Sequence, residues 1–296
     1  MLEKYLEWSK MHKRSHARDI SSSKHLRSFF GNKRLNDISS FDIERYKMKR
    51  KKEIKAMPKN RGKEERDVSF ASINRELALI KHLYKKANQW GIIDRNPVPG
   101  VKMFPEKMRE RYLKKYEINA LLKACEGSKN KSLKLIVTTA IYTGGRINEI
   151  LNIKVNDIDF SNSNINLPHT KTGDNHKLRM SENLKSEMRK YLKGHKHEYL
   201  FCKGDGTPYN DIRKSFKSAL KDAGIEDFRF HDLRHTYASQ LTMMGVDSRT
   251  IQELGRWKTP SMLMRYSHLS PEHMQSAVNT LDNLIPNKHE TSTFLI

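Results

Sequence analysis

A cluster of prolines near residue 100 constrains the fold of this chain more than any other feature. Pro97, Pro99 and Pro105 follow Asn96, and Gly100 lies among them. Proline disfavours helix at its own position and at the residue before it, so an extended connector is expected here. The chain has 296 residues, enough for about two domains, and the connector divides it near residue 107. We predict domains at residues 1–104 and 113–285, a linker at 105–112 and a tail at 286–296.

The first predicted domain has the pattern of helices separated by polar turns. Its clearest helix spans residues 69–90, where apolar residues recur every three or four positions from Ile73 to Ala87 and Gly91 ends the pattern. Such a stripe belongs to a core more often than to a binding site, and it leaves the opposite face for solvent or phosphate. Shorter helices are expected from residue 2, over residues 20–30, and after Ser40 as the N-cap of a third helix.

The second predicted domain is also mainly helical, but it contains one strand pattern. Residues 164–180 have the pattern of two strands with a turn at 172–175, which predicts a β-hairpin. The expected fold is therefore mainly α with a small antiparallel β-sheet, a helical first domain being followed by a mixed α+β domain. Helices are predicted at residues 117–124, 132–143, 181–192, 211–223, 230–244, 248–254 and 260–266 and near 271–285.

The charge balance indicates a polyanionic partner. Lysine and arginine number 57 against 34 acidic residues, which gives a formal net charge of +23 and a pI near 9.9. An excess this large favours nucleic acid over a surface that is basic only for solubility.

No apolar segment reaches the roughly 18 residues that a membrane span requires, and the first ten residues lack a secretory apolar region. Cys125 and Cys202 do not suggest a disulfide framework, so the cytoplasm is the expected compartment.

Residues 49–66 form the densest basic segment, and Pro58 and Gly62 interrupt any long helical pattern there. We expect a mobile basic loop. Two interpretations stay open at this point: a solvated linker, or a strand or arm that lies along a DNA backbone.

Several polar residues of the second domain suit chemistry on a phosphate. Arg146 follows Gly144 and Gly145, which allow close approach to a ligand, and Glu149 lies three residues further on, where it could orient a basic side chain. Alone this signal is weak, because an arginine at a helix start is usually a surface residue. Lys171, beside the predicted turn, could deliver a proton, which arginine does poorly because its pKa stays above about 12.

The segment that begins at His231 gives a sharper signal. On a helix, His231 and Arg234 lie three residues apart and can converge on one anion. His235 is expected to be a packed, hydrogen-bonded neighbour of such a site. No cysteine pair or acidic partner stands at zinc-ligand spacing, so no metal is predicted. Tyr266 could be a nucleophile or a core aromatic, and tyrosines are more often structural.

The order of these residues resembles that of the tyrosine recombinase, or phage integrase, family. Lys171 follows Arg146 by 25 residues, Trp257 follows Arg234 by 23, and Tyr266 follows Trp257 by 9. Those spacings fit the Arg, Lys, His-x-x-Arg, His or Trp, and Tyr series of the family. The segments at residues 74–77 and 94–97 look like parts of its core-binding domain, so the resemblance covers nearly the whole chain. The catalytic set it implies is Arg146, Lys171, His231, Arg234, Trp257 and Tyr266.

The chain departs from the family pattern in three places. Trp257 stands where many members have histidine, so this side chain can donate a hydrogen bond but cannot act as a base. Gly145 replaces a larger apolar residue, and we expect looser local packing there. No arm-binding domain precedes residue 1, which is expected either of a simple two-domain member or of a truncated chain.

The resemblance implies a mechanism without a metal, ATP or another cofactor. Tyr266 attacks the scissile phosphorus, displaces the 5′ oxygen and forms a 3′-phosphotyrosine. The two arginines neutralise the phosphate oxygens, and Lys171 protonates the leaving oxygen. His231 accepts or relays the phenol proton, and Trp257 donates to a phosphate oxygen or packs beside Tyr266. Glu149 and His235 support these groups from behind.

The same resemblance implies double-stranded DNA with a specific recombination site as the partner. A C-shaped clamp of two domains, a homotetramer that exchanges strands through a Holliday junction, and accessory DNA-bending or directionality factors are expected. The biological role would be integration or excision of a phage or another mobile element in a bacterial host, at the nucleoid. Candidate DNA contacts are Lys51, Lys52, Arg61, Lys63, Asn74, Arg75 and Lys81.

Other interpretations follow from the same residues. A non-catalytic DNA-binding regulator on the same scaffold would not need Lys171 and Tyr266 together. A type IB topoisomerase or telomere resolvase would use the same nucleophile. The apolar end at residues 294–296 either docks on a neighbouring subunit or is a frayed terminus.

Overall fold

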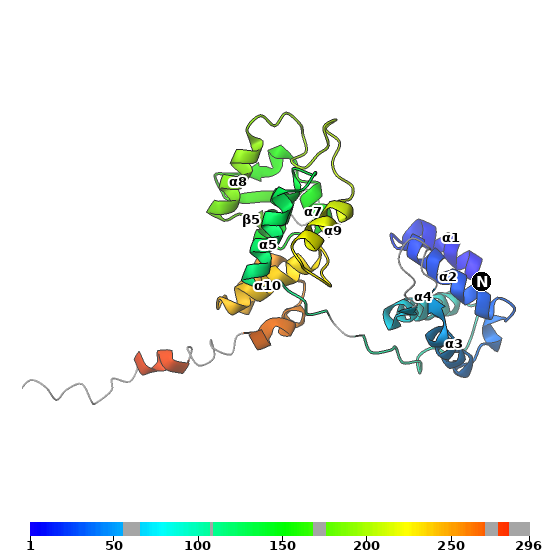
Figure 1. The fold of residues 1–296 in the computed structure, drawn as a ribbon. Helices are drawn as coiled ribbons and strands as arrows, with labels where there is room; N and C mark the ends of the chain where they lie inside the picture. Colours follow the sequence, from blue (N-terminus) through cyan, green and yellow to red (C-terminus); the bar gives the residue numbers. More distant parts are fainter. Residues whose placement is uncertain (56–65, 107–108, 168–175, 270–277, 284–296) are drawn as a thin grey trace, which may run out of the picture. The chain divides into compact units, whose positions relative to one another are not determined.

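The computed structural model describes residues 1–55, 66–106, 109–167, 176–269 and 278–283 (Figure 1). The chain forms two compact units, Met1–Met108 and Arg109–Ile296, which divide inside the linker expected at residues 105–112. The mainly α fold with a small antiparallel sheet is confirmed. Among the described residues, no helix is both long enough and apolar enough to cross a membrane.

The first unit is built on α4, the helix with the clearest periodicity. Its stripe from Ile73 to Ala87 is buried as predicted, and α4 packs against α1, α2 and α3. Ser69 caps it, since the hydroxyl accepts the Ser72 N–H at 3.3 Å. The helices of the unit are α1 (Leu2–His12), α2 (His16–Phe30), η1 (Leu35–Asp37), α3 (Ser40–Lys52) and α4 (Phe70–Gln89).

The third helix has its N-cap one residue earlier than predicted, at Ser39. The Ser39 hydroxyl accepts the Asp42 N–H at 3.2 Å, and the Asp42 carboxylate accepts the Ser39 N–H at 3.0 Å, so the two residues cap each other. Ser40 instead donates to the Pro97 carbonyl at 2.6 Å, which fastens α3 to the proline-rich connector. A hydroxyl at either position can cap a helix, and Asp42 at the third helical position decides between them.

The basic segment at residues 49–66 is only partly a loop. α3 continues through Lys52, so Lys51 and Lys52 are helical. After α3, strands β1 (Ile54–Lys55) and β2 (Arg66–Asp67) pair antiparallel and form a two-stranded ribbon. The stretch between them, with Arg61 and Lys63, lies outside the described residues.

The second unit contains a three-stranded antiparallel sheet in the order β3-β4-β5. The predicted hairpin corresponds to β4 (Asn164–Leu167) and β5 (His176–Arg179), with Asn164 opposite Arg179 and Leu167 opposite His176. Its turn lies outside the described residues. β3 (Ile158–Asp159) was not predicted, because two residues are too short to show an alternating pattern.

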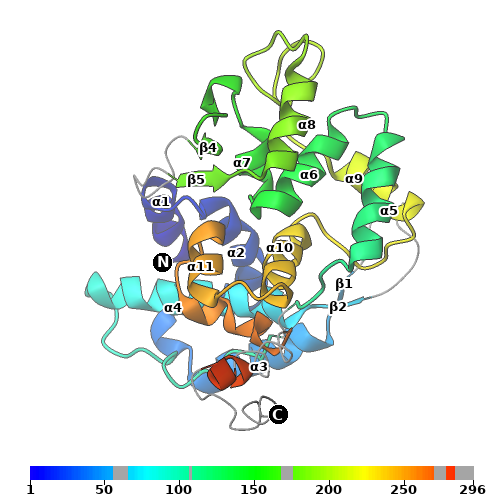
Figure 2. The same cartoon turned by 90° about the vertical axis from the view of Figure 1, so that its left-hand side faces the viewer.

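Helix α6 lies at the centre of this unit and packs against α5, α7, α8 and α10 (Figure 2). The segment predicted as one helix at residues 260–266 is two 3-10 helices separated at Leu263, and the short α7 was not predicted. The helices are α5 (Lys115–Glu126), α6 (Leu133–Thr143), α7 (Ile147–Leu151), η2 (Val155–Asp157), α8 (Glu182–Leu192), α9 (Arg213–Asp222), α10 (Asp232–Met243), α11 (Ser248–Gly255), η3 (Pro260–Met262), η4 (Met264–Leu269) and η5 (Thr280–Asn283).

Candidate active site

Two glycines end α6 and leave no room for larger residues. Gly144 has φ of +61°, and a Cβ there would lie 2.6 Å from the buried Tyr237 ring. Gly145 is also buried, and a Cβ would lie 3.0 Å from the side chain of Ile150. The expectation of looser packing at Gly145 is therefore wrong, because Ile150 fills the space that a larger residue would occupy. This tight junction places Arg146 directly at the start of α7.

Arg146 and Glu149 form a short bridge over the start of α7. The Glu149 carboxylate accepts the Arg146 N–H at 2.9 Å and its Nη1 at 2.8 Å, while 51% of the Arg146 side chain is exposed. Burial raises the pKa of Glu149. The hydrogen bond from the Arg146 N–H and the guanidiniums of Arg256 and Arg146 lower it by more, so the net pKa of Glu149 lies below its usual value. Glu149 is therefore ionised at neutral pH, and Arg146 keeps donors that face solvent.

Arg234 is buried on α10, with 4% of the residue exposed. Its Nη1 donates to the Gly144 carbonyl at 2.6 Å and its Nη2 donates to the Gly255 carbonyl. The guanidinium carbon also lies 4.2 Å from the centre of the Trp257 ring, a cation–π distance. Burial, and then the nearby Arg146 and Arg256, lower the pKa of Arg234 to about 10, which still leaves it charged at neutral pH.

Trp257 owes its position to Gly255. A Cβ on Gly255 would lie 1.6 Å from the Trp257 ring, so any other residue would displace the indole. The ring lies over Arg234, and its centre is 6.4 Å from that of Tyr266. Trp257 is thus packed between the cation and the phenol.

Tyr266 lies on η4 with 4% of the residue exposed, and it meets a histidine from α10. Its Oη is 2.5 Å from Nδ1 of His235. Burial raises the pKa of Tyr266 to about 12, against the opposing effect of Arg265 and Arg234. Burial, with His231 next, lowers the pKa of His235 to about 4. At neutral pH the imidazole is uncharged and can accept the hydrogen of the phenol.

His231 stands at the first turn of α10, on the exposed side of the cluster. The centre of its ring is 5.6 Å from that of His235. Desolvation by the surrounding protein, and then the positive charge of Arg234, lower the pKa of His231. The adjacent Asp232 is buried and accepts the Arg109 Nε and the Arg229 N–H, each at 2.8 Å. Asp232 therefore fixes the start of the helix that carries both histidines.

Five of the six predicted catalytic residues occur in one region of the second unit. Contacts run from Arg234 through Trp257 to Tyr266, and from Tyr266 through His235 to His231. Arg146 adjoins them, since Arg234 bonds the carbonyl of Gly144 two residues before it. Lys171, the sixth, lies outside the described residues.

Two further cations of this region were not predicted from the sequence. Arg256 donates from Nη2 to Glu149 at 2.7 Å, and Arg109 holds Asp232. Each pairs with a residue more than a hundred positions away in the chain. The only local signal was the position of Arg256 directly before Trp257.

The candidate DNA contacts of the first unit divide into exposed and buried residues. Lys51, Lys52 and Arg75 are exposed and Lys81 is half-buried. Asn74 is buried: its amide donates to the Phe104 carbonyl and to Glu106, and its oxygen accepts the Phe104 N–H at 2.8 Å. Because these bonds occupy both ends of the amide, Asn74 fastens the connector to α4 and is withdrawn from the DNA-contact set.

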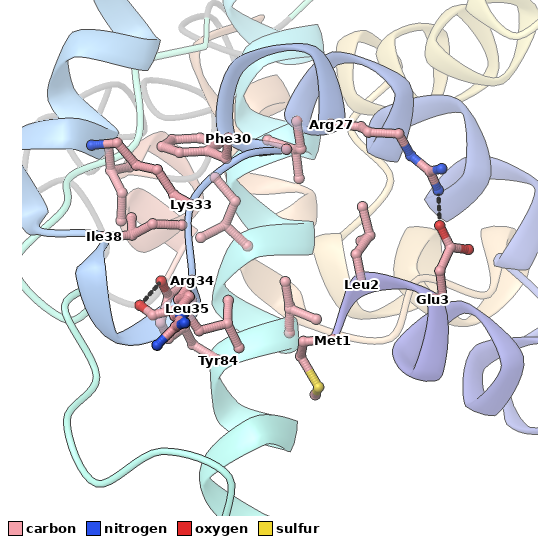
Figure 3. A pocket seen from close by; sticks show the side chains of 15 residues that line it. Met1, Leu2, Glu3, Arg27, Phe30, Lys33, Arg34, Leu35, Ile38 and Tyr84 are labelled. Atoms are coloured by element: carbon pink, nitrogen blue, oxygen red, sulfur yellow. Dashed lines mark hydrogen bonds and ion pairs between the residues drawn. The ribbon is translucent and has the colours of Figure 1, made fainter.

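The first unit also contains a pocket of 510 Å³ beside its core, lined largely by apolar side chains (Figure 3). Its edges are held by the Arg27–Glu3 ion pair and by a hydrogen bond from Tyr84 to the Leu35 carbonyl. None of the five predicted catalytic residues that the structure describes lines it. The pocket is therefore separate from the polar cluster of the second unit.

Comparison with known proteins gives one family. Residues 111–273 match the phage integrase family. The integrase of Salmonella phage P22 is 33% identical over 223 residues, which are 70% of this chain and 56% of that protein. The integrase of Haemophilus phage HP1 is 29% identical over 273 residues, or 89% of this chain and 74% of that protein. The chain thus spans little more than half the length of the P22 relative.

Solved structures share the fold over most of the chain. The Tn1549 transposon integrase in complex with a circular intermediate DNA has a TM-score of 0.73 at 18% identity and covers 95% of this chain and 99% of that one. A λ integrase dimer bound to a COC′ core site has a TM-score of 0.70 at 20% identity and covers 88% and 95%. At these identities the likeness concerns the fold.

Proposed function

The chain belongs to the phage integrase family, and from this we propose that it is a site-specific tyrosine recombinase that cuts and rejoins duplex DNA. One observation supports this most strongly: a buried tyrosine hydroxyl lies 2.5 Å from a neutral histidine nitrogen, in the region that holds Arg146 and Arg234. A phenol beside a proton acceptor and fixed cations is what an attack on a phosphodiester requires.

In the proposed reaction the Tyr266 oxygen attacks the scissile phosphorus and the bond to the 5′ oxygen breaks. The phenol proton passes to Nδ1 of His235, and the product is a 3′-phosphotyrosine plus a free 5′ hydroxyl. The new ester conserves the energy of the broken one, so rejoining needs no ATP. This proposal differs from the expectation that His231 takes the proton, because His235 lies against the phenol. His231 is left to face a phosphate oxygen beside Arg234.

The two arginines have different parts in this proposal. Arg234 is held by two backbone carbonyls and the Trp257 ring, so little reorganisation is needed when charge develops on the phosphate. Arg146 is half exposed and can present its remaining donors to an equatorial oxygen. A guanidinium suits a role that requires a permanent cation.

Lys171 completes the proposal as the general acid that protonates the 5′ oxygen. Support comes from its place in the family series, 25 residues after Arg146. An ammonium can release a proton near neutral pH when its surroundings lower its pKa, whereas a guanidinium cannot.

We extend the proposal to the partners and setting. The net charge of +23 supports duplex DNA as the substrate, with Lys51, Lys52, Arg75 and Lys81 in contact with its backbone and Arg61 and Lys63 in the segment beyond α3. A homotetramer on paired sites, assisted by DNA-bending or directionality factors, would carry out strand exchange for a phage or another mobile element. The setting is the nucleoid of a bacterial cell.

A covalent-trapping experiment tests this function. On a nicked suicide substrate carrying the native site, the wild-type protein should accumulate a protein–DNA adduct, and Tyr266→Phe should bind the site equally but form none. Tyr237→Phe is the matched control, since it also removes one buried hydroxyl of the second unit. A wild-type protein that binds without an adduct would indicate a regulator. Relaxation of supercoiled DNA without recombination of paired sites would indicate a topoisomerase.

A further inference from the structure

We infer that Arg256 is a positioning residue of this active site, which holds Arg146 in place for the scissile phosphate through the carboxylate of Glu149. The inference rests on the proposed function. It concerns a residue outside the predicted catalytic set.

The backbone of Arg256 is in a conformation that an arginine adopts at a cost. Its φ of +58° and ψ of +46° lie in the left-handed region, at the C-terminal end of α11. Glycine takes this conformation without the steric penalty of a Cβ and is the usual residue at the end of a helix. An arginine in this conformation costs conformational energy, so its side chain must make an interaction that glycine cannot make.

The side chain reaches into the polar cluster. Only 8% of it is exposed, and its Nη2 donates to Oε2 of Glu149 at 2.7 Å. The same carboxylate accepts the N–H and Nη1 of Arg146. Glu149 is therefore held between two guanidiniums, one from the end of α11 and one from the start of α7. Without Arg256, Arg146 would be the one described hydrogen-bond partner left to orient the carboxylate.

The other side-chain nitrogens of Arg256 are buried inside the same cluster. Among the residues that the structure describes, neither its Nε nor its Nη1 has a hydrogen-bond acceptor. Buried donors are nearly always satisfied, and an exception requires an explanation such as strain, a catalytic role, a water or an ion. Among the described residues, Arg146, Arg234 and Arg256 place three positive charges near the carboxylate of Glu149. A bound phosphodiester would reduce this excess charge, so the arrangement favours the state in which DNA occupies the site.

The decisive variant is Arg256→Gly, because glycine keeps the left-handed backbone while it removes the guanidinium. Single-turnover cleavage of the nicked substrate should fall at least about tenfold, with non-covalent affinity for the site changed less than about threefold and the melting temperature maintained. Arg256→Lys should recover part of the rate, since an ammonium can pair with Glu149 but not in a fork. Arg249→Ala is the control, since Arg249 lies on the same helix in an exposed pair with Glu253.

A double-mutant cycle separates positioning from an independent effect. If Arg256 acts through Glu149, then Glu149→Gln alone should lose a similar factor, and the double variant should be no slower than the slower single variant. The inference would be overturned if the rate losses of the two single variants multiply in the double variant, or if Arg256→Gly cleaves as fast as the wild type. It would also be overturned if the melting temperature of Arg256→Gly falls and its DNA binding weakens with it.

The wild-type protein distinguishes this inference from the proposed function. If the wild-type protein forms no adduct through Tyr266, the proposed function fails and the role of Arg256 fails with it. If it forms the adduct and the Arg256 variants cleave equally well, only the role of Arg256 is refuted.

Discussion

Replacing His235 by alanine tests whether the histidine against Tyr266 takes the phenol proton during cleavage. In the resting protein the pKa of Tyr266 is about 12 and that of His235 is about 4. Both shifts disfavour transfer of the proton from the phenol to the imidazole before the attack begins. The resting pair is therefore neutral. The proton can move only as the new oxygen–phosphorus bond forms and makes the phenol more acidic.

The magnitude of the defect follows from this timing. A positioned general base contributes typically about 10²- to 10⁴-fold to a rate, so His235→Ala should slow cleavage at pH 7 by a factor in that range. Wild-type cleavage should be insensitive to the His235 ionisation between pH 6 and 9, because its pKa of about 4 leaves the imidazole neutral throughout. In the alanine variant hydroxide must take the proton, and the rate should rise about tenfold per pH unit.

The assay is single-turnover formation of the covalent adduct on a nicked substrate from pH 6 to 9. His231→Ala is the matched control, because its ring lies beside His235 but has no bond to the phenol. It should lose rate without acquiring the new pH slope. A His235→Ala variant that cleaves as fast as wild type, or that is slow with an unchanged pH profile, would refute the assignment of His235 as proton acceptor.

Three other predictions follow from the site and its surroundings. Lys171→Ala should cleave slowly, and a substrate with a 5′-bridging phosphorothiolate should restore its rate, since that leaving group needs no proton; equal defects on both substrates would remove Lys171 from this role. Gly144→Ala should lower the free energy of unfolding by about 2–4 kcal/mol in a denaturant titration, because φ is +61° and the new Cβ meets the Tyr237 ring at 2.6 Å; an unchanged midpoint would contradict this. Charge reversal of lysines within residues 49–63 should flatten the dependence of log affinity on log salt, and an unchanged slope would exclude this segment from the interface.

Local patterns predicted the elements of this protein well wherever burial repeats along one helix. The α4 stripe is an example, because a residue every three or four positions faces the core whatever the core contains. The α10 segment is another, since helical geometry alone places His231 and Arg234 near each other. Short elements such as α7 and β3 escaped prediction, because five or two residues carry too little periodicity.

The partners of the polar side chains depended on the tertiary structure. Asn74 looked like a phosphate contact on a helix face until the connector at Phe104 turned back and occupied its amide. His235 looked like a supporting residue, and the packing of η4 against α10 brought Tyr266 to its ring.

The sequence by itself determined the residue types available for chemistry, their order and the helices that carry them, because these follow from local spacing. Only the tertiary structure decided which histidine meets the nucleophile and that Arg256, 107 positions from Glu149, shares its carboxylate with Arg146. Hydrogen bonds need alignment within a few tenths of an ångström, and that alignment is set by the packing of distant elements rather than by neighbours in the chain.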